Sequence, residues 1–453
     1  MDKDFKSIRP VTDASRPGVY IETYGCQMNV NDSEVILSLL EDEGYALCDS
    51  MEKASLAIIN TCAIRDNAEQ RIWGRLEVFR QLRKKHRLTV CIVGCMAERL
   101  KEELLEHPAV DIVAGPDSYR ALPGLIKKLS SAEGGKQIDV MLSNEETYAD
   151  ISPVRLDKNG VSAYISIMRG CNNVCSYCVV PYTRGSERSR DYRTILREAG
   201  ELQANGYKEI NLLGQNVDSY LWTEDRRVDF AALLRMTAEA YPGMRIRFST
   251  SHPKDISDEV IRTMASYDNI CKHIHLPVQS GSSRMLELMR RKYDREWYLE
   301  RIRKIREIMP DCAITTDIIA GFCTETAEDH LQTLSLMEEV RFDGAFMFQY
   351  SERPGTLAAR RYKDDVPPET KTERLNEIIR LQNRISLENN MKEIGRRMVV
   401  LIEGTSKRNK DELFGRASNN KVCVFPSNGH KIGEYAEVEV LDCTSATLIS
   451  KTI

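Results

Sequence analysis

The chain alternates short apolar segments with longer amphipathic ones, and this alternation limits the possible folds more than any other feature of the sequence. Four short segments near the start, rich in β-branched residues, are typical of buried parallel strands: residues 19–26, 56–62, 89–95 and 111–116. The segments between them have the charged and apolar pattern of helices. This repeated strand–helix unit predicts a small doubly wound α/β domain.

The middle of the chain repeats the same scheme. Six strand candidates alternate with helical stretches: residues 162–170, 209–217, 244–251, 272–280, 313–322 and 344–351. Six consecutive units of this kind predict a partial (βα)6 barrel or a closed barrel. An open doubly wound sheet is the alternative that the pattern leaves open.

From residue 396 onward the pattern changes to short strands. Ala436, Val438 and Val440 alternate with Glu437 and Glu439, which is typical of a half-buried strand. About 60 residues of this kind predict a small β-barrel, a module that often binds nucleic acid. We therefore expect five segments: a disordered tail (1–17), an N-terminal α/β domain (18–128), a linker (129–155), a central barrel (156–388) and a small β-barrel (389–453).

Composition and charge narrow the class of protein. No stretch approaches about 18 consecutive apolar residues and the N-terminus has no apolar run, so we expect no membrane span, no secretory signal and a cytoplasmic location. Because disulfides are disfavoured in the cytosol, the 13 cysteines indicate either buried thiols or metal and redox chemistry. The formal net charge of −4 does not favour a nucleic-acid partner, so that partner must be argued from local basic patches.

Three cysteines, Cys171, Cys175 and Cys178, form a C-x3-C-x2-C motif just after the first predicted barrel strand. Barrel enzymes keep their chemistry at this rim. A 4Fe-4S cube takes four ligands, so three thiolates leave one iron open to a substrate or cofactor. A zinc knuckle is the alternative, but no fourth Cys or His lies nearby in the sequence. With the aromatic Tyr177 before its last cysteine, the motif resembles that of the radical S-adenosylmethionine (SAM) superfamily, whose open iron binds SAM and whose cluster cleaves it to a 5′-deoxyadenosyl radical.

A second set of cysteines, Cys26, Cys62 and Cys95, is spread along the first domain at intervals of 36 and 33 residues. Each is the last residue of a predicted strand, and ligands of parallel α/β sheets bind outside the carboxyl ends of strands. Gly25 and Gly94 would allow tight backbone turns beside them. The arrangement predicts a second three-thiolate cluster, with three unrelated buried thiols as the alternative.

Several stretches, in order along roughly residues 18–450, resemble the methylthiotransferase family. They include ETYGCQMNVNDSE, NTCAIRDNAEQ, VGCMAER, MRGCNNVCSYCVVPYTRGSERSR, HLPVQSGSSRML and FQYSERPGT. The resemblance implies a cysteine-bearing N-terminal domain, a radical SAM partial (βα)6 barrel and a C-terminal TRAM β-barrel. It also implies two 4Fe-4S clusters, one on each set of three cysteines, and SAM as both methyl donor and radical precursor.

Within that family, NTCAIRDNAEQRI and CVVPYTRGSERSR are similar to the branch that modifies isopentenylated adenosine beside the anticodon of tRNA. The C2–H bond of this base is unactivated, so a carbon radical rather than an acid or base must remove the hydrogen. The auxiliary cluster on the N-terminal cysteines would present a sulfur that another SAM has first methylated. The implied partners are this tRNA and a reducing electron donor, and we expect the transferase to act as a monomer.

Residues for binding SAM and RNA are expected at strand ends and in basic patches, respectively. The SAM candidates are Tyr177, Gly214, Gln215, Asn216, Ser249, Ser251, Gln279 and Asp317. The RNA candidates are Arg184, Arg188, Arg396, Arg397, Lys407, Arg408, Lys410 and Arg416. The alternative for the first set is a role in capping or turns, and for the second a solvated charged face.

Three other functions fit parts of the pattern. Related methylthiotransferases act on threonylcarbamoyl-adenosine in tRNA or on a ribosomal protein, and only motif similarity separates them here. A second alternative is an RNA-binding protein whose clusters are structural or sense redox state. A third is a cobalamin-dependent radical SAM enzyme, although the D-x-H-x-x-G cobalamin motif is absent from the sequence.

Overall fold

The structure is a computed structural model that describes residues 16–63, 66–129, 131, 135–156 and 159–453. The chain forms two compact units. The N-terminal unit comprises the described residues up to 156 together with 164–172 and 179–195. The C-terminal unit comprises 159–163, 173–178 and 196–453. Of the expected disordered tail, residues 1–15 lie outside the described part of the chain.

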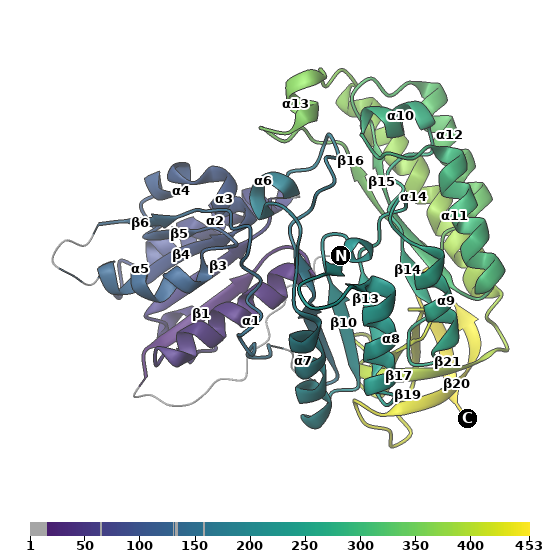
Figure 1. Cartoon of the computed structure of the whole chain (residues 1–453), viewed down its shortest axis with the longest axis horizontal. Coiled ribbons are helices and arrows are strands. Elements are labelled where there is room, and N and C mark those ends of the chain that lie inside the picture. Colours follow the sequence, from purple (N-terminus) through teal and green to yellow (C-terminus); the bar gives the residue numbers. More distant parts are fainter. Residues whose placement is uncertain (1–15, 64–65, 130, 132–134, 157–158) are drawn as a thin grey trace. The chain divides into compact units, whose positions relative to one another are not determined.

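The N-terminal unit contains a six-stranded parallel sheet in the order β2-β1-β3-β4-β5-β6 (Figure 1). Its strands are β1 (Gly18–Thr23), β2 (Ala46–Leu47), β3 (Leu56–Thr61), β4 (Thr89–Gly94), β5 (Ile112–Ala114) and β6 (Gln137–Asp139). Its main helices are α1 (Gln27–Asp42), α2 (Asp66–Leu82), α3 (Cys95–Leu100), α4 (Glu102–Glu106) and α5 (Leu122–Leu129). Helices α1 and α5 pack on one face of the sheet and α2, α3 and α4 on the other, which confirms the doubly wound prediction.

The segment expected to be a linker, residues 129–155, is largely part of this domain. Strand β6 extends the sheet in parallel to β5, although its half-exposed residues give it little hydrophobic signal. Tyr148 is 3% exposed and packs in the core beside α1, and its hydroxyl donates a hydrogen bond to the Pro116 carbonyl at 3.0 Å. Because the segment is polar, the sequence did not indicate that it contains strand β6 and the core residue Tyr148.

Six strands follow one another in sequence order, as a partial barrel requires; the first crosses the boundary between the two units and the other five belong to the C-terminal unit. They are β7 (Ser162–Ser166), β10 (Glu209–Leu213), β13 (Arg245–Ser249), β14 (His273–His275), β15 (Ala313–Ala320) and β16 (Gly344–Gln349). The sheets β13-β10-β7 and β14-β15-β16 are joined by a parallel bridge between Ile246 and Ile270. Among the strands that the structure describes, none pairs β7 with β16, so the barrel is open and the partial (βα)6 prediction is confirmed.

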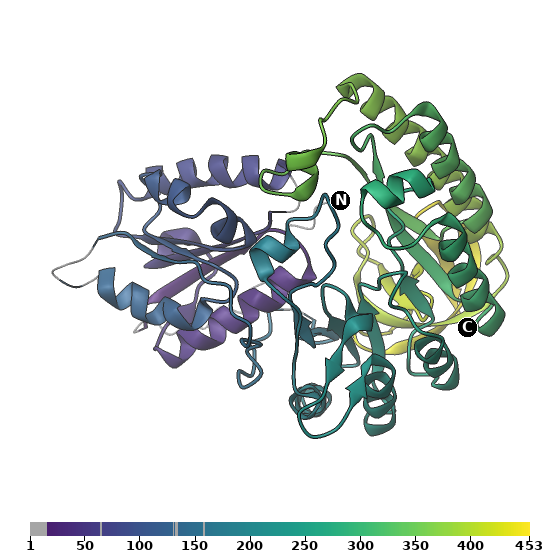
Figure 2. The same cartoon turned by 45° about the horizontal axis from the view of Figure 1, so that its top comes forward.

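Helices connect these strands and cover their outer side. They are α7 (Tyr192–Ala204), α8 (Phe230–Ala240), α9 (Asp258–Ser266), α10 (Ser283–Leu288), α11 (Arg295–Ile308), α12 (Ala327–Val340), α13 (Leu357–Arg361) and α14 (Pro368–Met391). Figures 1 and 2 both show α11, α12 and α14 outside strands β14 to β16. Shorter elements are β8 (Met168–Arg169), α6 (Val180–Arg184) and β9 (Arg188–Ser189) in the N-terminal unit, and β11 (Leu221–Trp222) and β12 (Val228–Asp229) in the C-terminal unit.

The last segment forms a closed barrel in the order β17-β18-β19-β21-β20. Its strands are β17 (Arg397–Thr405), β18 (Glu412–Ala417), β19 (Val422–Pro426), β20 (Tyr435–Cys443) and β21 (Leu448–Thr452). In β20 the predicted inward residues Ala436, Val438 and Val440 are at most 3% exposed and lie in the barrel core. The alternating pattern of the sequence thus identified the correct inward face.

Within the C-terminal unit, buried charges join this small barrel to the larger one. The Arg247 guanidinium donates to the Ala417 carbonyl at 2.8 Å. Lys421, with a side chain 9% exposed, lies 3.4 Å from a carboxylate oxygen of Asp343 and 3.2 Å from one of Glu393. Over the part of the chain that the structure describes, no helix combines the length and the apolar character needed to cross a membrane.

Candidate functional site

The three N-terminal cysteines lie at the ends of neighbouring strands. Cys26 directly precedes α1, Cys62 directly follows β3, and Cys95 is the first residue of α3, immediately after β4. Strands β1, β3 and β4 are adjacent and parallel, so their carboxyl ends share one edge of the sheet. The sequence predicted each cysteine as the last residue of a strand, whereas the structure places each one just beyond its strand, and the role of the cysteines as cluster ligands stays a prediction.

Two glycines allow the backbone to approach these cysteines closely. Gly25 has φ +132°, and a Cβ there would lie 2.6 Å from the Cβ of Cys62. Gly94 has φ +93°, and a Cβ there would lie 2.5 Å from the Thr61 carbonyl oxygen. Any other residue would therefore push the ends of β1, β3 and β4 apart.

The three cysteines are not grouped around the position of a single metal ion. Among the described residues, no three His, Cys, Asp or Glu side chains are grouped so that they could hold one metal ion. A 4Fe-4S cube binds each thiolate at a different iron, so its ligands surround the cube rather than converge on one point. Three thiols at three neighbouring strand ends supply the three ligands that the sequence predicts for such a cube.

A buried layer of amides lies beside Cys26. The Cys26 N–H donates to Asn29 Oδ1 at 3.3 Å, and Asn29 Nδ2 donates to Asn60 Oδ1 at 3.0 Å. Asn60 Nδ2 in turn donates to Ser33 Oγ at 3.0 Å. Both asparagines are 0% exposed, so this layer holds the start of α1 against the end of β3. Neither asparagine was expected from the sequence, although each lies within three residues of a cysteine.

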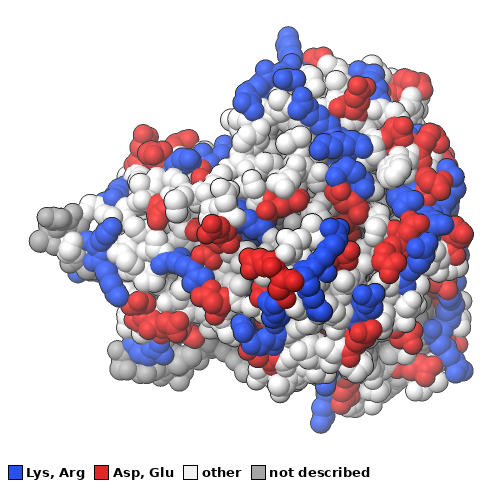
Figure 3. Space-filling model, in the orientation of Figure 1, with Lys and Arg blue, Asp and Glu red and all other residues white. Residues whose placement is uncertain are grey.

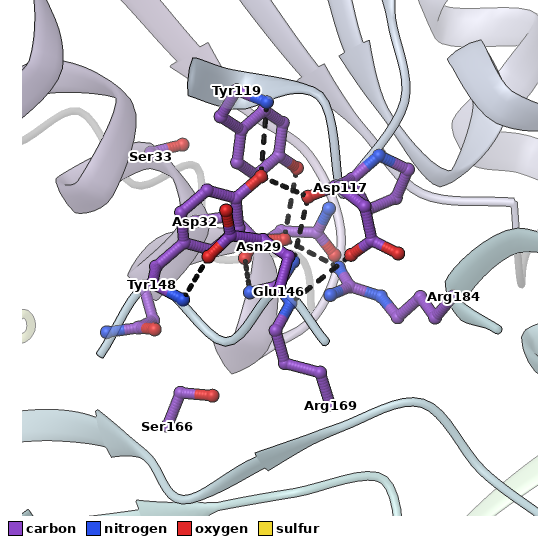
Figure 4. Close-up of polar contacts among 12 residues, drawn as sticks. Asn29, Asp32, Ser33, Asp117, Tyr119, Glu146, Tyr148, Ser166, Arg169 and Arg184 are labelled. Atoms are coloured by element: carbon purple, nitrogen blue, oxygen red, sulfur yellow. Dashed lines mark hydrogen bonds and ion pairs between the residues drawn. The ribbon is translucent and has the colours of Figure 1, made fainter. Parts of the chain in front are cut away.

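A carboxylate in the same helix is surrounded by cations (Figure 4). Asp32 is 0% exposed and accepts hydrogen bonds from Arg169 Nη1 and Arg184 Nη2, each at 2.8 Å, and from the Tyr119 hydroxyl at 3.2 Å. Burial opposes ionisation of Asp32, but the two guanidinium groups outweigh it and lower its pKa. Asp32 is therefore the ionised centre of this group.

A second buried carboxylate extends the group. Asp117 Oδ1 lies 2.8 Å from Arg188 Nη2 and 3.6 Å from Arg169 Nε. We call Asp32, Asp117, Arg169, Arg184 and Arg188 the buried charge cluster. All five side chains are at most 3% exposed, so these ions interact with one another rather than with bulk water.

The buried charge cluster reaches one of the cysteines. Arg184 Nε donates to Cys95 Sγ at 3.2 Å. Burial raises the pKa of the Cys95 thiol, and the Arg184 charge opposes that rise. This corrects the expectation that Arg184 and Arg188 contact RNA, because both are buried in ion pairs with aspartates and present no guanidinium to solvent.

The C-x3-C-x2-C segment crosses from one unit to the other. Cys171 belongs to the N-terminal unit, while Cys175 and Cys178 belong to the C-terminal unit. There, Arg291 Nη1 lies 3.3 Å from Cys175 Sγ and 3.5 Å from the Tyr177 hydroxyl. Arg291 is 5% exposed and was not anticipated, because nothing in its sequence surroundings indicates contact with a cysteine 116 residues earlier.

Several SAM candidates gather at the ends of β10 and β13. Gly214, Gln215 and Asn216 follow β10, and the Gly214 N–H donates to the carbonyl of Ser249, the last residue of β13, at 3.1 Å. Ser251, two residues further on, is 2% exposed. Asn216 is 1% exposed, and its Oδ1 has no hydrogen-bond partner among the described residues. A buried acceptor of this kind suits a ligand that donates N–H or O–H groups.

The remaining SAM candidates are more dispersed. Gln279 follows β14 with φ +72°, and its N–H donates to the Asp317 carbonyl at 2.8 Å. Asp317 was expected at a strand end, but β15 continues three residues beyond it to Ala320, and its carboxylate lies 3.4 Å from His275 Nε2. Tyr177 packs edge-on against a phenylalanine ring within the C-terminal unit.

The residues expected to contact RNA in the last barrel differ in their exposure and in whether they form ion pairs. Arg396 pairs with Glu393 at 3.1 Å, and Arg416 pairs with Glu403 at 3.1 Å. Besides Arg396, the exposed candidates are Arg397, Lys407, Arg408 and Lys410. Basic and acidic side chains are interspersed over the face shown in Figure 3, so on that face binding of phosphates would depend on such local groups.

Three protein families match the chain in succession. They are Uncharacterized protein family UPF0004 at residues 18–115, the Radical SAM superfamily at 165–337 and the TRAM domain at 391–453. These boundaries correspond to the α/β domain, the partial barrel and the closed barrel described above.

Curated relatives match almost the whole chain. One from Phocaeicola vulgatus is 54% identical over 448 residues, covering 98% of this chain and 97% of the relative. One from Amoebophilus asiaticus is 56% identical over 448 residues, covering 96% and 92%. One from Porphyromonas gingivalis is 53% identical over 440 residues, covering 96% and 95%. All three are named tRNA-2-methylthio-N(6)-dimethylallyladenosine synthase.

Solved structures with similar folds are more distant in sequence. The radical SAM methyltransferase TsrM from Kitasatospora setae superposes with a TM-score of 0.58 at 16% identity, covering 76% of this chain and 75% of that one. The cobalamin-dependent SAM radical enzyme OxsB superposes with a TM-score of 0.52 at 12% identity, covering 82% and 56%. At such low identity these similarities describe the fold alone.

Proposed function

The chain belongs to the family of tRNA-2-methylthio-N(6)-dimethylallyladenosine synthases, and from this membership we propose that it transfers a methylthio group to C2 of N6-isopentenyladenosine in tRNA. The observation that carries the proposal is the presence of two separate three-cysteine sets. One set follows three adjacent strands of the α/β domain, and the other follows the first strand of the radical SAM barrel. An enzyme that must both generate a radical and deliver sulfur needs two such centres.

The two sets would hold different groups. Cys171, Cys175 and Cys178 would ligate the 4Fe-4S cluster that binds SAM, and the N-terminal cysteines would ligate an auxiliary 4Fe-4S cluster. When bound, the two clusters and SAM supply the reducing electron, the carbon radical that removes the C2 hydrogen and the methylated sulfur that replaces it. All further tasks, which are holding, orienting and shielding these groups, fall to the side chains of the protein.

Exposure suggests how substrate reaches the auxiliary centre. Cys62 and Cys95 are each 3% exposed, whereas Cys26 is exposed. The two buried cysteines would keep bulk water from the centre, and the Asn29–Asn60 layer would hold the loop that carries Cys26. The side marked by Cys26 is therefore where we place the approach of the base and of the sulfur to be transferred.

SAM would lie at the ends of β10 and β13. Asn216 Oδ1, buried and without a partner among the described residues, fits the ammonium group of SAM. The hydrogen bond from Gly214 to Ser249 holds the two strand ends together beneath it. Arg291, hydrogen-bonded to Cys175, would orient one thiolate of the SAM-binding cluster.

Recognition of tRNA is assigned to the last barrel. Its exposed cations Lys407, Arg408 and Lys410 lie between β17 and β18 and are suited to contact phosphates. A reducing electron donor completes the reaction. The monomeric state and the cytoplasmic location stay predictions, to be checked by light scattering of the purified protein and by cell fractionation.

Substrate identity is tested by mass spectrometry of tRNA nucleosides from a strain that lacks the gene. We expect loss of the 2-methylthio form and accumulation of N6-isopentenyladenosine, with the active chain restoring the product. Loss of a methylthiolated threonylcarbamoyl-adenosine instead would assign the chain to the related tRNA branch.

Cluster assignment is tested by iron content. The reconstituted protein should bind about eight irons, four per cluster, and replacing Cys26, Cys62 and Cys95 by Ala should remove about half. That variant should still release 5′-deoxyadenosine from SAM but form no methylthio product. Cys443→Ala, which changes a half-buried cysteine of the last barrel, is the control and should leave the iron content unchanged. Product formation without the N-terminal cysteines would contradict the assignment of sulfur delivery to them.

A further inference from the structure

Arg184 is the last residue of α6 and is 2% exposed. Two of its three nitrogens have partners: Nε donates to Cys95 Sγ at 3.2 Å and Nη2 to Asp32 Oδ2 at 2.8 Å. The third, Nη1, is buried and has no hydrogen-bond partner among the described residues. Because a guanidinium group is rigid and planar, fixing two nitrogens also fixes the third. A buried N–H donor held beside a cysteine without an acceptor indicates a missing partner.

The charges of these five side chains agree with a nearby anion. The buried charge cluster contains three arginines (Arg169, Arg184 and Arg188) and two aspartates (Asp32 and Asp117), which leaves one positive charge in excess. Unbalanced charge away from water is costly unless an ion of opposite sign lies nearby. Three thiolates with their iron–sulfur core provide such an anion.

The neighbouring Arg169 shows that Asp32 alone does not explain Arg184. Arg169 bonds the same carboxylate at 2.8 Å and is equally buried, and its Nη2 donates to the Pro116 carbonyl at 3.0 Å. Its Nε has no hydrogen-bond partner among the described residues either, but it lies 3.6 Å from the Asp117 carboxylate. Arg184 differs in that one of its nitrogens donates to a cysteine sulfur.

We propose that Arg184 is a positioning residue for the auxiliary centre, with Nε donating to the Cys95 thiolate and Nη1 donating to a second anionic sulfur of the group held there. The inference rests on the proposed function, because it requires that Cys26, Cys62 and Cys95 hold a cluster. Hydrogen bonds from a cation to cluster sulfurs favour the reduced form, which carries one more negative charge. Arg184 therefore raises the reduction potential of this centre and holds its sulfur in a fixed orientation.

The test isolates the auxiliary centre in the full-length chain. Cys171, Cys175 and Cys178 are changed to Ala, so that one cluster remains, and the protein is titrated with dithionite while the reduced cluster is followed by electron paramagnetic resonance. Arg184→Gln should lower the ratio of reduced to oxidised cluster at least tenfold at a fixed potential, which is about 59 mV for one electron. Arg169→Gln is the matched control. It removes the same charge from the same aspartate, and among the described residues Arg169 donates no hydrogen bond to a sulfur, so the potential of this variant should stay close to that of the parent.

The shifts in reduction potential of the two variants decide whether the proposal holds. Equal shifts in the Arg184→Gln and Arg169→Gln variants would overturn the proposal, because they would reflect charge at a distance rather than contact with sulfur. In D2O, electron–nuclear double resonance should detect exchangeable protons coupled to the reduced cluster that disappear in Arg184→Gln but not in Arg169→Gln. Their persistence in Arg184→Gln would also reject it.

Two other causes of a negative result, misfolding of the variant and a wrong cluster assignment, can be distinguished from failure of the Arg184 proposal. If circular dichroism shows that Arg184→Gln does not fold, Arg184→Lys decides, because lysine keeps the charge but not the planar donor set. A parent-like potential in Arg184→Lys would then overturn the proposal. If the parent without the barrel cysteines binds no iron at all, the proposed function has failed, whereas a loaded cluster insensitive to Arg184 rejects only the present inference.

Discussion

Replacing Asp32 with Asn is expected to destabilise the N-terminal unit strongly. Asp32 is 0% exposed and is the only carboxylate in the buried charge cluster that accepts hydrogen bonds from both Arg169 and Arg184, each at 2.8 Å. The amide is nearly the same size but carries no charge. The substitution therefore leaves the packing almost unchanged and removes the counter-charge of two buried guanidinium groups.

The magnitude follows from the burial of all three groups. Removing one partner of a buried ion pair costs about 3–5 kcal/mol, because the other charge remains away from water without compensation. For a domain of about 150–250 residues each kcal/mol corresponds to about 2–4 °C, so the unfolding transition of the N-terminal unit should fall by about 6–20 °C. The measurement is differential scanning calorimetry of the full-length chain with equal iron content in every sample.

Asp150→Asn is the matched control. Asp150 also pairs with an arginine, Arg120, but its side chain is 71% exposed, and exposed pairs contribute about 0–1 kcal/mol. Its transition should therefore move by at most a few degrees, about 2–4 °C per kcal/mol. If Asp32→Asn shifts the transition no more than Asp150→Asn does, the view that the buried charge cluster stabilises this unit is refuted.

The pH dependence provides a second arm of the same test. The pKa of Asp32 is lowered in the folded state, where Arg169 and Arg184 outweigh burial. A lowered folded pKa means that the stabilisation is fully present above the unfolded value of about 3.9 and is lost as the pH falls through the folded value. The stability difference between the parent and Asp32→Asn should therefore be largest near neutral pH and shrink on acidification, and a constant difference would argue against an ionic origin.

Three further changes have expected outcomes. Gly94→Ala should reduce iron loading by the N-terminal cysteines and destabilise that domain, because its Cβ would lie 2.5 Å from a backbone oxygen at φ +93°; iron assay and calorimetry check this. Reversing the charges of Lys407, Arg408 and Lys410 to Glu should weaken tRNA binding and reduce the slope of log K against log salt by about 2, at about 0.7–0.9 per lost phosphate contact, as measured by filter binding; an unchanged slope would exclude these residues from the interface. Lys421→Met should destabilise the C-terminal unit by about 2 kcal/mol in chemical denaturation, because it leaves carboxylates without a buried cation, and should leave iron content unaltered.

The sequence by itself determined the order of the domains and the position of the cysteines. Short β-branched segments separated by amphipathic ones identified β1, β3 and β4, and a parallel sheet places the residues that follow them on one edge. Cys26, Cys62 and Cys95 could therefore be grouped although they are 36 and 33 residues apart. The C-x3-C-x2-C motif could be recognised without any prediction of strands, because its three cysteines lie within eight consecutive residues.

Only the tertiary structure decided what the charged residues do. Arg184 and Arg188 belong to a basic run that looks solvated in the sequence, yet Arg184 bonds a carboxylate 152 residues earlier and lies in the N-terminal unit. Lys421 follows a polar stretch of the sequence, yet it is buried beside two carboxylates. Hydrophobic periodicity reveals which apolar residues face inward, since burial of apolar groups depends on local pattern. A buried ion also needs a partner of opposite charge, and which residue becomes that partner depends on how distant segments are brought together.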